Sequence, residues 1–461
     1  MPGRIRKPCV LRILPGMDLN QDPYPSNQPR NRKNVHSHFM KGFPMKRIRT
    51  VLPIFVFLAS LLALTSVFAD AAASVSTAEP ADTSVIRLGI IGTDTSHVPA
   101  FVKLFNAPNA EGDYQKLEIT AAVKGGMPDN ESSWSRKDQY PQDIVPFGVK
   151  IYATIEEMLP HVDGVLIESV DGRPHLEFAR PVIAAGKPLF IDKPMAGNLW
   201  ETLEIFRLAE ERNVPLFSAS SLRYSASIQE VRNASPHGET HGIAAWSPCH
   251  LNECHPDFYW YGIHGVETLF TMMGGAGCVS VSRTSTPNYD LAVGVWNDGR
   301  IGTFRGIRAG SAPYGGMVFG SKGVNIAGKY DGYKPLCDQI CTFFLTGKSP
   351  IDPQETLEIM AFMSAADASK AQNGAHVTLE SVIESAKALK VRTFSVKLAA
   401  DGKLQLDGND ISLTDLNAKL RLPDTRSYYR VIFENLGTDD SARDAVLQNL
   451  GDAVLVRYIY P

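Results

Sequence analysis

Between residues 84 and 236, short apolar segments alternate with segments whose apolar residues recur at helical spacing. Six apolar segments are predicted β-strands: 85–91, 117–123, 149–152, 162–168, 189–191 and 214–217. Helical periodicity follows over about 98–105, 175–185 and 201–212, and Thr154 with Glu157 forms a capping box that opens another helix. Residues 127–147 are polar and proline-containing, which predicts a loop. Alternating strands and helices predict a doubly wound parallel sheet.

The turn after the first strand is a candidate phosphate-binding turn. A strand, a glycine turn and a helix form the unit that binds the pyrophosphate of a dinucleotide, usually with the pattern G-x-G-x-x-G. Those three places hold Gly92, Asp94 and His97, so the first glycine alone is kept. Thr93 and Ser96 complete the candidate cofactor-binding turn. At the second place, Asp94 brings a side chain and a negative charge to where the backbone approaches phosphate.

Further polar residues follow other predicted strands. Glu168, His175, Lys193 and Arg223 all fall at or just beyond carboxyl ends, where open α/β sheets bind ligands. Lys124 stands at the end of the second strand, where an acidic residue usually binds the ribose of NAD. Lys124 suits a 2′-phosphate or a protein without bound adenosine, and an exposed structural lysine is an equal alternative.

The motifs in this order resemble the glucose–fructose oxidoreductase/inositol dehydrogenase (Gfo/Idh/MocA) family. They are V-D-G-V at 162–165, R-P-H at 173–175, A-G-K-P-L-F-I-D-K-P at 185–194 and L-R-Y at 222–224. The resemblance extends over about 84–390, and Asp192 stands where the family usually has Glu. It implies a Rossmann-like domain over 84–236, with NAD or NADP as cofactor. It also implies that Lys193, flanked by Asp192 and Pro194, meets both nicotinamide and the substrate hydroxyl.

Residues 237–392 are predicted to form an α+β domain with a mostly antiparallel open sheet. In the family this domain covers the nicotinamide end of the cleft and mediates substrate binding or dimerisation. His264 matches the family histidine and is a candidate acid/base, although Trp260 replaces the aspartate four residues earlier. Glu267 lies one turn beyond His264 and either supplies the missing carboxylate or has a structural role. Residues 259–261 form an aromatic cluster, suited to a sugar ring or to a core.

The tail, residues 393–461, is a predicted small α/β extension. Strand patterns at 394–398, 404–408, 428–433 and 453–458 are interleaved with helices at 413–420 and 441–450. The order resembles the periplasmic domain of ExbD/TolR-type transport proteins, which implies protein contact or dimerisation. A generic α/β extension is the alternative.

The N-terminal 83 residues are expected to lie outside the folded part. Residues 45–49 are basic, 51–68 are uncharged and apolar, and 67–69 end in a small-residue pattern, which predicts a signal peptide over about 45–69. Cleavage is expected after Ala69 or Ala71, followed by a linker to 83, and Met45 is the better start. An uncleaved anchor is the alternative, since the apolar run approaches the ~20 residues that span a bilayer. We therefore expect a periplasmic or secreted protein, or a membrane-anchored one.

Charge argues against nucleic acid as a partner, and the cysteine pattern argues against a zinc site. The 461 residues carry a net charge of −3, but residues 1–49 hold +9, so the rest carries about −12 and is unsuited to nucleic acid. Five cysteines follow the signal, an odd number. The C-H-L-N-E-C-H segment at 249–255 fits no standard zinc spacing, so an ordinary loop is favoured and no metal is predicted.

Two functions follow from these residues. The first is an exported oxidoreductase that uses NAD(P) on a sugar, polyol or related hydroxy compound, with Lys193 and His264 at the reacting oxygen. The second is a cofactor-poor relative that binds or cleaves carbohydrate. Export favours the second, because Lys46-Arg47 lacks the twin arginine that accompanies export of folded, cofactor-loaded proteins. A small-molecule substrate is expected in either case, with possible self-association.

Overall fold

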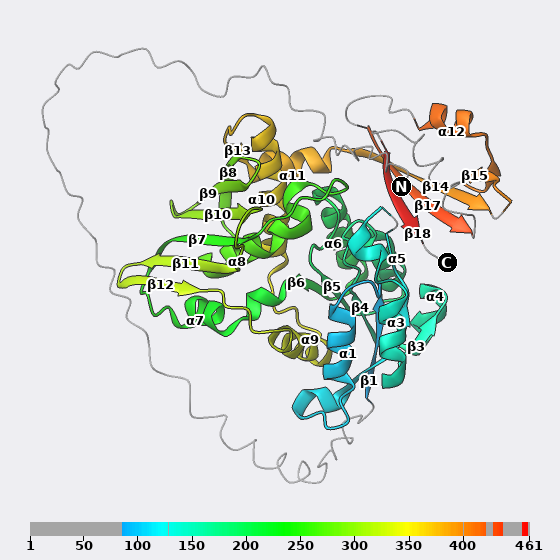
Figure 1. Ribbon diagram of the computed structural model, residues 1–461, viewed down its shortest axis with the longest axis horizontal. Helices are drawn as coiled ribbons and strands as arrows, with labels where there is room; N and C mark the ends of the chain where they lie inside the picture. The colour runs from blue at the N-terminus through cyan, green and yellow to red at the C-terminus, as the bar shows by residue number, and fades with distance from the viewer. Residues whose placement is uncertain (1–84, 128, 400, 421–426, 437–453, 460–461) are drawn as a thin grey trace, which may run out of the picture. The chain divides into compact units, whose positions relative to one another are not determined.

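The computed structural model describes residues 85–127, 129–399, 401–420, 427–436 and 454–459, which form three sheets with flanking helices (Figure 1). The predicted signal peptide, the segment before it and the linker lie outside the described residues. Within the described ranges, no helix is long and apolar enough to cross a membrane.

The first sheet has six parallel strands. They are β1 (Ile86–Ile91), β2 (Leu117–Val123), β3 (Lys150–Tyr152), β4 (Gly164–Ile167), β5 (Leu189–Asp192) and β6 (Leu216–Ala219), in the order β3-β2-β1-β4-β5-β6. The order reverses between β1 and β4, the switch point at which such sheets bind ligands. The Rossmann-like prediction is confirmed.

Helices cover this sheet. They are α1 (His97–Phe105), α2 (Glu131–Trp134), α3 (Gln139–Ile144), α4 (Ile155–Met158), α5 (His175–Ala184) and α6 (Leu199–Arg212), with 3-10 turns η1 (Gly112–Lys116), η2 (Val145–Phe147), η3 (Leu159–His161) and η4 (Ser221–Tyr224). The next helix, α7 (Ala226–Ala234), contacts the second sheet instead. The Thr154 hydroxyl accepts the Glu157 N–H, as the capping box predicts. The predicted loop over 127–147 was wrong, because α2, α3 and η2 lie there. Pro141 and Pro146 stand near the starts of α3 and η2, where a missing N–H costs nothing.

The second sheet has seven strands. They are β7 (Thr240–Pro248), β8 (Cys278–Ser285), β9 (Tyr289–Trp296), β10 (Ile301–Ile307), β11 (Gly315–Gly320), β12 (Gly323–Ala327) and β13 (Val377–Thr378), in the order β12-β11-β7-β10-β9-β8-β13. Among the described pairs of this sheet, β7 and β10 alone are parallel. Helices α8 (Ile263–Met273), α10 (Pro353–Ala371) and α11 (Leu379–Lys387) contact the sheet. The predicted mostly antiparallel sheet is confirmed.

One helix of the second half packs against the first sheet. The apolar face of α9 (Lys334–Thr346) includes Leu336, Ile340 and Phe343, which share a core with β1 and α1. Gly164 at the start of β4 lies so close to Phe344 that a Cβ there would be 2.4 Å from the ring. The segment leading into α9 is therefore held near the carboxyl ends of the first sheet.

The third sheet forms the extension. It contains β14 (Lys390–Ala399), β15 (Leu404–Leu406), β16 (Asn409–Asp410), β17 (Ser427–Leu436) and β18 (Val454–Ile459), in the order β16-β15-β14-β17-β18, with α12 (Leu413–Lys419). Pairing of β14 with β17 and of β17 with β18 is parallel. The first strand begins at Lys390, three residues before the predicted boundary. The predicted helix over 441–450 lies outside the described residues.

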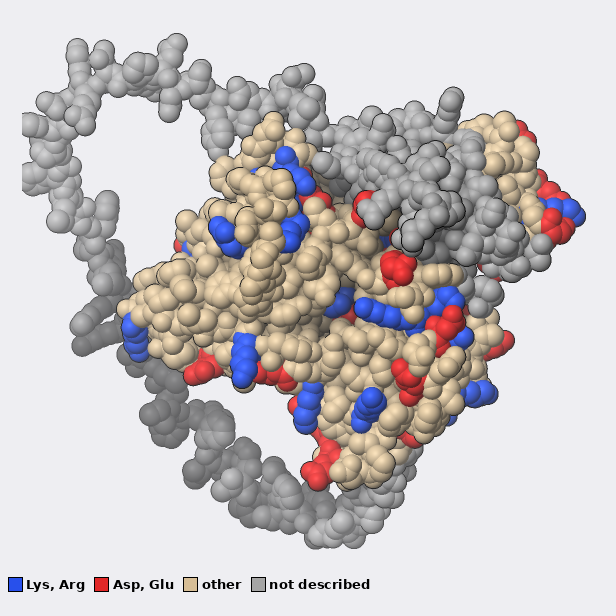
Figure 2. Space-filling view, in the orientation of Figure 1, with Lys and Arg blue, Asp and Glu red and all other residues tan. Residues whose placement is uncertain are grey.

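Charged side chains are dispersed on the visible surface. Figure 2 shows Lys and Arg interspersed with Asp and Glu on this face, rather than gathered in a large field of one sign. Acidic and basic groups of the described residues often pair at the surface, as Arg87 does with Asp163.

Candidate active site

Gly92 shapes the turn at the end of β1. Its φ is +86°, in the left-handed region, and a Cβ would lie 2.6 Å from the Ser169 nitrogen, in the loop after β4. Only glycine fits this turn. The first position of the predicted phosphate-binding pattern therefore requires glycine, because a side chain there would prevent the β1 and β4 loops from meeting.

The rest of the turn is buried apart from Ser96. Thr93, Asp94 and His97 are buried, whereas Ser96 is exposed and makes no side-chain cap to α1. The Ser133 hydroxyl donates to Asp94 at 2.5 Å. Burial raises the pKa of Asp94 to about 6, with Ser133 opposing the shift. Asp94 is thus a carboxyl group that holds its proton more firmly than usual.

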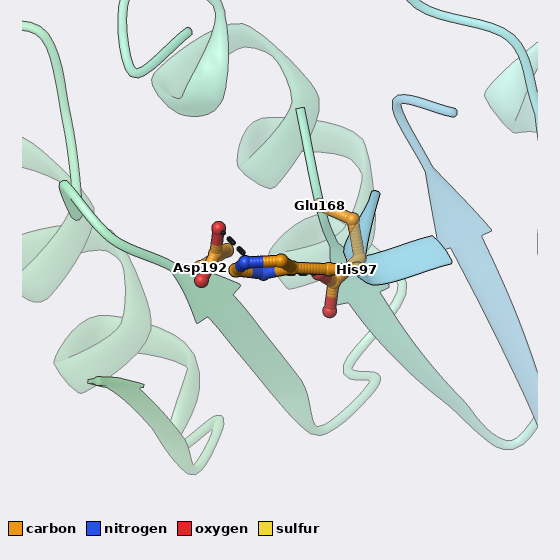
Figure 3. Close-up of side chains that lie close together, drawn as sticks. All are labelled: His97, Glu168 and Asp192. Carbon is orange, nitrogen blue, oxygen red and sulfur yellow. Dashed lines mark ion pairs between the residues drawn. The ribbon is translucent and has the colours of Figure 1, made fainter. Parts of the chain in front are cut away.

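His97 turns from the start of α1 toward the end of β5. Its Nδ1 lies 3.1 Å from Asp192 Oδ2 and 3.7 Å from Glu168 Oε2 (Figure 3). Burial alone would lower the pKa of His97, but the Asp192 carboxylate raises it to about 10. Burial would raise the pKa of Asp192, yet the charges of His97 and Lys193 hold it below its usual value.

Lys193 approaches the same carboxylate. Its Nζ lies 3.2 Å from Asp192 Oδ2, and the side chain is 8% exposed. Burial would lower the pKa of Lys193, but Asp192 raises it, so Lys193 is an ammonium ion near pH 7. Glu168, at the end of β4, is fully buried, and burial raises its pKa to about 7.

His175 and Pro194 join the loops that frame these groups. His175 Nε2 lies 3.0 Å from the Ser169 carbonyl oxygen and Nδ1 lies 3.0 Å from the Pro194 carbonyl oxygen. Both carbonyls only accept hydrogen bonds and a neutral imidazole carries one N–H, so His175 donates to one carbonyl and lies against the other. His175 therefore ties the β4 loop to the β5 loop, and burial lowers its pKa.

His264 enters the site from the first turn of α8. This helix follows a π-helical turn, η5 (Phe258–Gly262), and lies close to the second sheet, where a Cβ on Gly265 would meet the Phe304 ring at 2.2 Å. His264 Nδ1 is 2.8 Å from the Ser220 hydroxyl, at the end of β6. Burial, followed by the Lys193 charge, holds the pKa of His264 well below its usual value. His264 is therefore neutral and close enough to Lys193 to feel its charge.

Glu267 supports this arrangement through other residues. Its carboxylate accepts the Ser220 backbone N–H at 2.7 Å and the Arg223 Nε–H at 2.7 Å. Arg223 also donates to Glu355 on α10 at 2.8 Å. Burial raises the pKa of Glu267, with Arg223 opposing the shift. Glu267 and Arg223 hold the β6 loop that carries Ser220, and Ser220 in turn contacts His264.

An arc of aromatic rings runs from His97 to Tyr261. It consists of His97–Tyr333 (ring centroids 4.6 Å apart), Tyr333–Tyr330 (5.9 Å), Tyr330–Tyr314 (6.5 Å), Tyr314–His264 (5.7 Å) and His264–Tyr261 (5.6 Å). Tyr333 and Tyr261 both contribute to the raised pKa of Lys193, so both ends of the arc lie near this lysine. The predicted aromatic cluster contributes Tyr261, whereas Tyr259 is core and Trp260 contacts His255.

Two other sequence features lie outside this arc. Lys124 is exposed, with Nζ 3.6 Å from Asp138. The described cysteines, all five, are free and buried, and His255 in the former zinc candidate bonds to Asp171 at 2.9 Å. The residues missed by sequence reasoning are Tyr314, Tyr330, Tyr333 and Ser220. Tyr, Gly and Lys are frequent in 309–334, but this composition alone does not show that the tyrosines contact His97 and His264.

The turn fits a dinucleotide in part. Among the described residues, Thr93 Oγ1 is a buried hydroxyl oxygen without a hydrogen-bond partner at the end of β1. A glycine turn, this hydroxyl and the amino end of α1 suit a phosphate. An ionised Asp94 would repel a phosphate. The raised pKa of Asp94 and its hydrogen bond from the Ser133 hydroxyl weaken that repulsion.

Comparison with protein families identifies the first domain. Residues 86–220 match the model of an oxidoreductase family with an NAD-binding Rossmann fold. Over these residues the chain is similar to the Gfo/Idh/MocA oxidoreductase family. An uncharacterised oxidoreductase of Synechocystis sp. is 35% identical over 82 residues, which are 17% of this chain and 22% of the relative. An uncharacterised protein of Saccharomyces cerevisiae is 26% identical over 148 residues, 32% of this chain and 39% of that protein. The matches thus span less than half of either relative.

Solved structures share the fold of this chain over about two thirds of its length. A probable dehydrogenase from Thermotoga maritima has a TM-score of 0.53 at 18% identity, covering 65% of this chain and 100% of that one. The myo-inositol dehydrogenase of Lactobacillus casei, solved with NAD(H) and myo-inositol, has a TM-score of 0.51 at 15% identity, covering 64% and 96%. A putative myo-inositol dehydrogenase from Sinorhizobium meliloti has a TM-score of 0.52 at 16% identity, covering 64% and 100%.

Proposed function

We propose that this protein is an exported oxidoreductase that uses NAD(P) on a sugar, polyol or related hydroxy compound. The observation that carries the proposal is that Lys193, at the end of β5, and His264, whose Nδ1 lies 2.8 Å from the Ser220 hydroxyl at the end of β6, both lie at the carboxyl edge of the first sheet. The Lactobacillus casei relative of similar fold was solved with NAD(H) and myo-inositol, which supports a polyhydroxylated substrate.

Lys193 and His264 divide the proton chemistry. The ammonium of Lys193 donates a hydrogen bond to the substrate oxygen and stabilises negative charge there. His264 uses Nδ1 toward Ser220, which leaves Nε2 to accept the hydroxyl proton. The low pKa of His264 keeps that nitrogen unprotonated at neutral pH, and the raised pKa of Lys193 keeps the ammonium charged.

Residues of the β1 turn and the adjoining loops would hold the cofactor. Gly92 and Thr93 would face its phosphates, and Lys193 and Pro194 would border its nicotinamide. When bound, the nicotinamide supplies the hydride acceptor. Lys124 at the end of β2 is available to a 2′-phosphate. The tyrosine arc supplies flat faces on which the apolar side of a sugar or cyclitol ring stacks.

A second candidate is a carbohydrate-binding or carbohydrate-cleaving protein without dehydrogenase activity. Asp94 favours it, because a buried carboxyl group stands where the usual pattern has a glycine beside phosphate. The tyrosine arc and His264 serve this function equally well.

Nicotinamide binding separates the two candidates. The chain is purified as the cell processes it, examined for bound nicotinamide by absorbance and fluorescence, and titrated with NADH and NADPH. Retained or micromolar cofactor is expected, with reduction of NAD(P)+ by a polyol or sugar from a substrate screen. Absence of binding by either form rejects the dehydrogenase. Cell fractionation and the mature N-terminus test export, with a start at Asp70 or Ala72 expected after cleavage.

A further inference from the structure

The strongest unexplained feature of the molecule is a triad of buried ligand groups. His97 Nδ1 and one carboxylate oxygen each of Glu168 and Asp192 lie within 4.8 Å of one another. They come from three different elements, the start of α1 and the ends of β4 and β5, and meet between them (Figure 3). We propose that this triad binds a divalent first-row transition-metal ion, in the range from Mn²⁺ to Zn²⁺.

The spacing of the three groups suits such an ion. Ligand atoms held 2.0–2.2 Å from a tetrahedral zinc ion lie roughly 3.3–3.6 Å apart. His97 Nδ1 lies 3.1 Å from Asp192 Oδ2 and 3.7 Å from Glu168 Oε2. The Glu168 and Asp192 oxygens lie within 4.8 Å of each other, so rotation of these side chains brings all three groups onto one ion.

The carboxylates point to a ligand independently of their spacing. Glu168 and Asp192 are fully buried, and none of their four oxygens makes a hydrogen bond in the described structure. Their ion contacts with His97 and Lys193 lack hydrogen-bond geometry. Burying an ionised carboxylate without hydrogen bonds is costly, and a bound cation removes that cost. Asp192 Oδ2, the oxygen nearest His97 Nδ1, also lies 3.2 Å from the Lys193 ammonium, so it already faces positive charge before an ion binds.

The scaffold holds the triad in place before an ion binds. The His97 ring stacks on Phe101 at 5.6 Å and meets Tyr333 at 4.6 Å, so packing fixes its direction. Each carboxylate stands at a strand end in the interior of a six-stranded sheet. Ligands on such rigid elements keep a metal geometry precisely.

The donor set selects the class of ion. One imidazole nitrogen with two carboxylate oxygens suits Mn²⁺, Fe²⁺, Co²⁺ and Zn²⁺, while Ca²⁺ takes six to eight oxygens and Cu⁺ prefers sulfur. Three protein ligands also leave coordination positions for water or a substrate oxygen. This inference does not depend on the proposed dehydrogenase, because the triad binds the ion without nicotinamide.

Metal binding by the full chain, free of a polyhistidine tag, tests the site. After chelation, Co²⁺ is titrated by calorimetry and visible d–d absorption, and Zn²⁺ by its effect on the thermal midpoint. We expect one equivalent, a d–d spectrum and a raised midpoint. Glu168→Gln and Asp192→Asn should bind at least about 100-fold more weakly, since even loss of an outer-sphere partner costs about 10- to 100-fold.

The matched control is Asp94→Asn, which removes another buried carboxyl of the same domain but no ligand of the triad. It should keep the wild-type stoichiometry and spectrum. Circular dichroism checks that each variant folds. A wild type that binds no ion, or a Glu168→Gln variant that binds and is stabilised as the wild type is, overturns the proposal. NADH titration of the same samples reports on the proposed dehydrogenase separately.

Discussion

Two buried ionic clusters of this molecule are built in opposite ways. In the first, which we call the clamp (Asp129, Asp171, Arg173 and His255), Arg173 donates to Asp129 at 2.7 Å and to Asp171 at 2.7–3.2 Å. Asp171 also bonds His255 at 2.9 Å and accepts from the Asn130 amide at 3.0 Å. In the second, the edge cluster (His97, Glu168, Asp192 and Lys193), the carboxylate oxygens make no hydrogen bond within the described structure.

The difference separates structural charge from functional charge. In the clamp, hydrogen bonds within the protein offset the free-energy cost of burying the charges. These bonds also hold the β4 loop against His255 of the second half. In the edge cluster the buried carboxylates lack hydrogen bonds, so their burial is unfavourable until a ligand binds them. Such clusters are typical of functional sites. The clamp should therefore govern stability, and the edge cluster should govern binding and catalysis.

Removal of Arg173 should give the largest effect on stability. Arg173→Leu leaves Asp171 and Asp129 without their cation, and loss of one partner of a buried ion pair costs about 3–5 kcal/mol. Urea unfolding monitored by circular dichroism measures it. The control is Arg87→Leu, whose exposed pair with Asp163 at 3.0 Å is screened by solvent, so little change is expected. Equal losses in the two variants would contradict the assignment of the clamp.

Lys193→Ala should affect catalysis and leave the fold intact. We expect kcat to fall by about 10²- to 10⁴-fold, the usual contribution of a positioned proton donor. Asp192 keeps His97 beside it, so the midpoint of unfolding should change little. Lys187→Ala, before the opposite end of β5, is the matched control and should keep wild-type kcat. The rate of NAD(P)H formation is the readout, and a Lys193 variant with wild-type kcat sinks its assigned role.

Asp94 makes the stability of the protein depend on pH. Burial raises its folded pKa from 3.8 to about 6, so between these values the folded state binds more protons than the unfolded state. Stability from this group is thus highest below pH 4 and is lost as pH rises toward 6. Asp94→Asn should be more stable than wild type at pH 7 by about 2–3 kcal/mol, a difference that vanishes near pH 4. A pH-independent difference in urea unfolding would refute this.

The architecture was predictable because it depends on local patterns. Each strand of the first sheet is a short apolar run that ends near glycine or a polar residue, so β1 to β6 and the ligand-binding edge could be predicted. Gly92, Glu168 and Lys193 were identified because they stand at such strand ends, whereas Asp192 and the role of Lys193 came from the resemblance to the family. Strands β7 to β10 followed from alternation and turns such as N-D-G-R at 297–300, whereas β11 and β13 were not predicted.

The convergence of side chains was not predictable. The direction of His97 depends on Tyr333, which lies more than two hundred residues later and is placed by the packing of α9 on the first sheet. The spacing of residues along the chain does not predict the contact between His97 and Tyr333. Likewise, Glu267 was a candidate catalytic carboxylate, and only its bonds to Ser220 and Arg223 show that it supports His264 from behind.

Substitutions in the tyrosine arc should have the smallest effect on KM and stability. They test whether aromatic rings, like the charged groups, divide into a binding set and a structural set. Tyr333→Leu removes a partly exposed ring that touches His97, and such contacts are worth about 0.5–1.5 kcal/mol, so KM for the hydroxy substrate should rise by about tenfold or less. Tyr259→Phe removes a buried hydroxyl, 2.8 Å from Ser364 and 3.1 Å from the Met360 carbonyl oxygen, and should cost about 1 kcal/mol of stability with unchanged KM. Steady-state kinetics and urea unfolding on both variants decide the matter. If Tyr259→Phe alters KM while Tyr333→Leu does not, the substrate lies against the core side of η5 and the arc is structural.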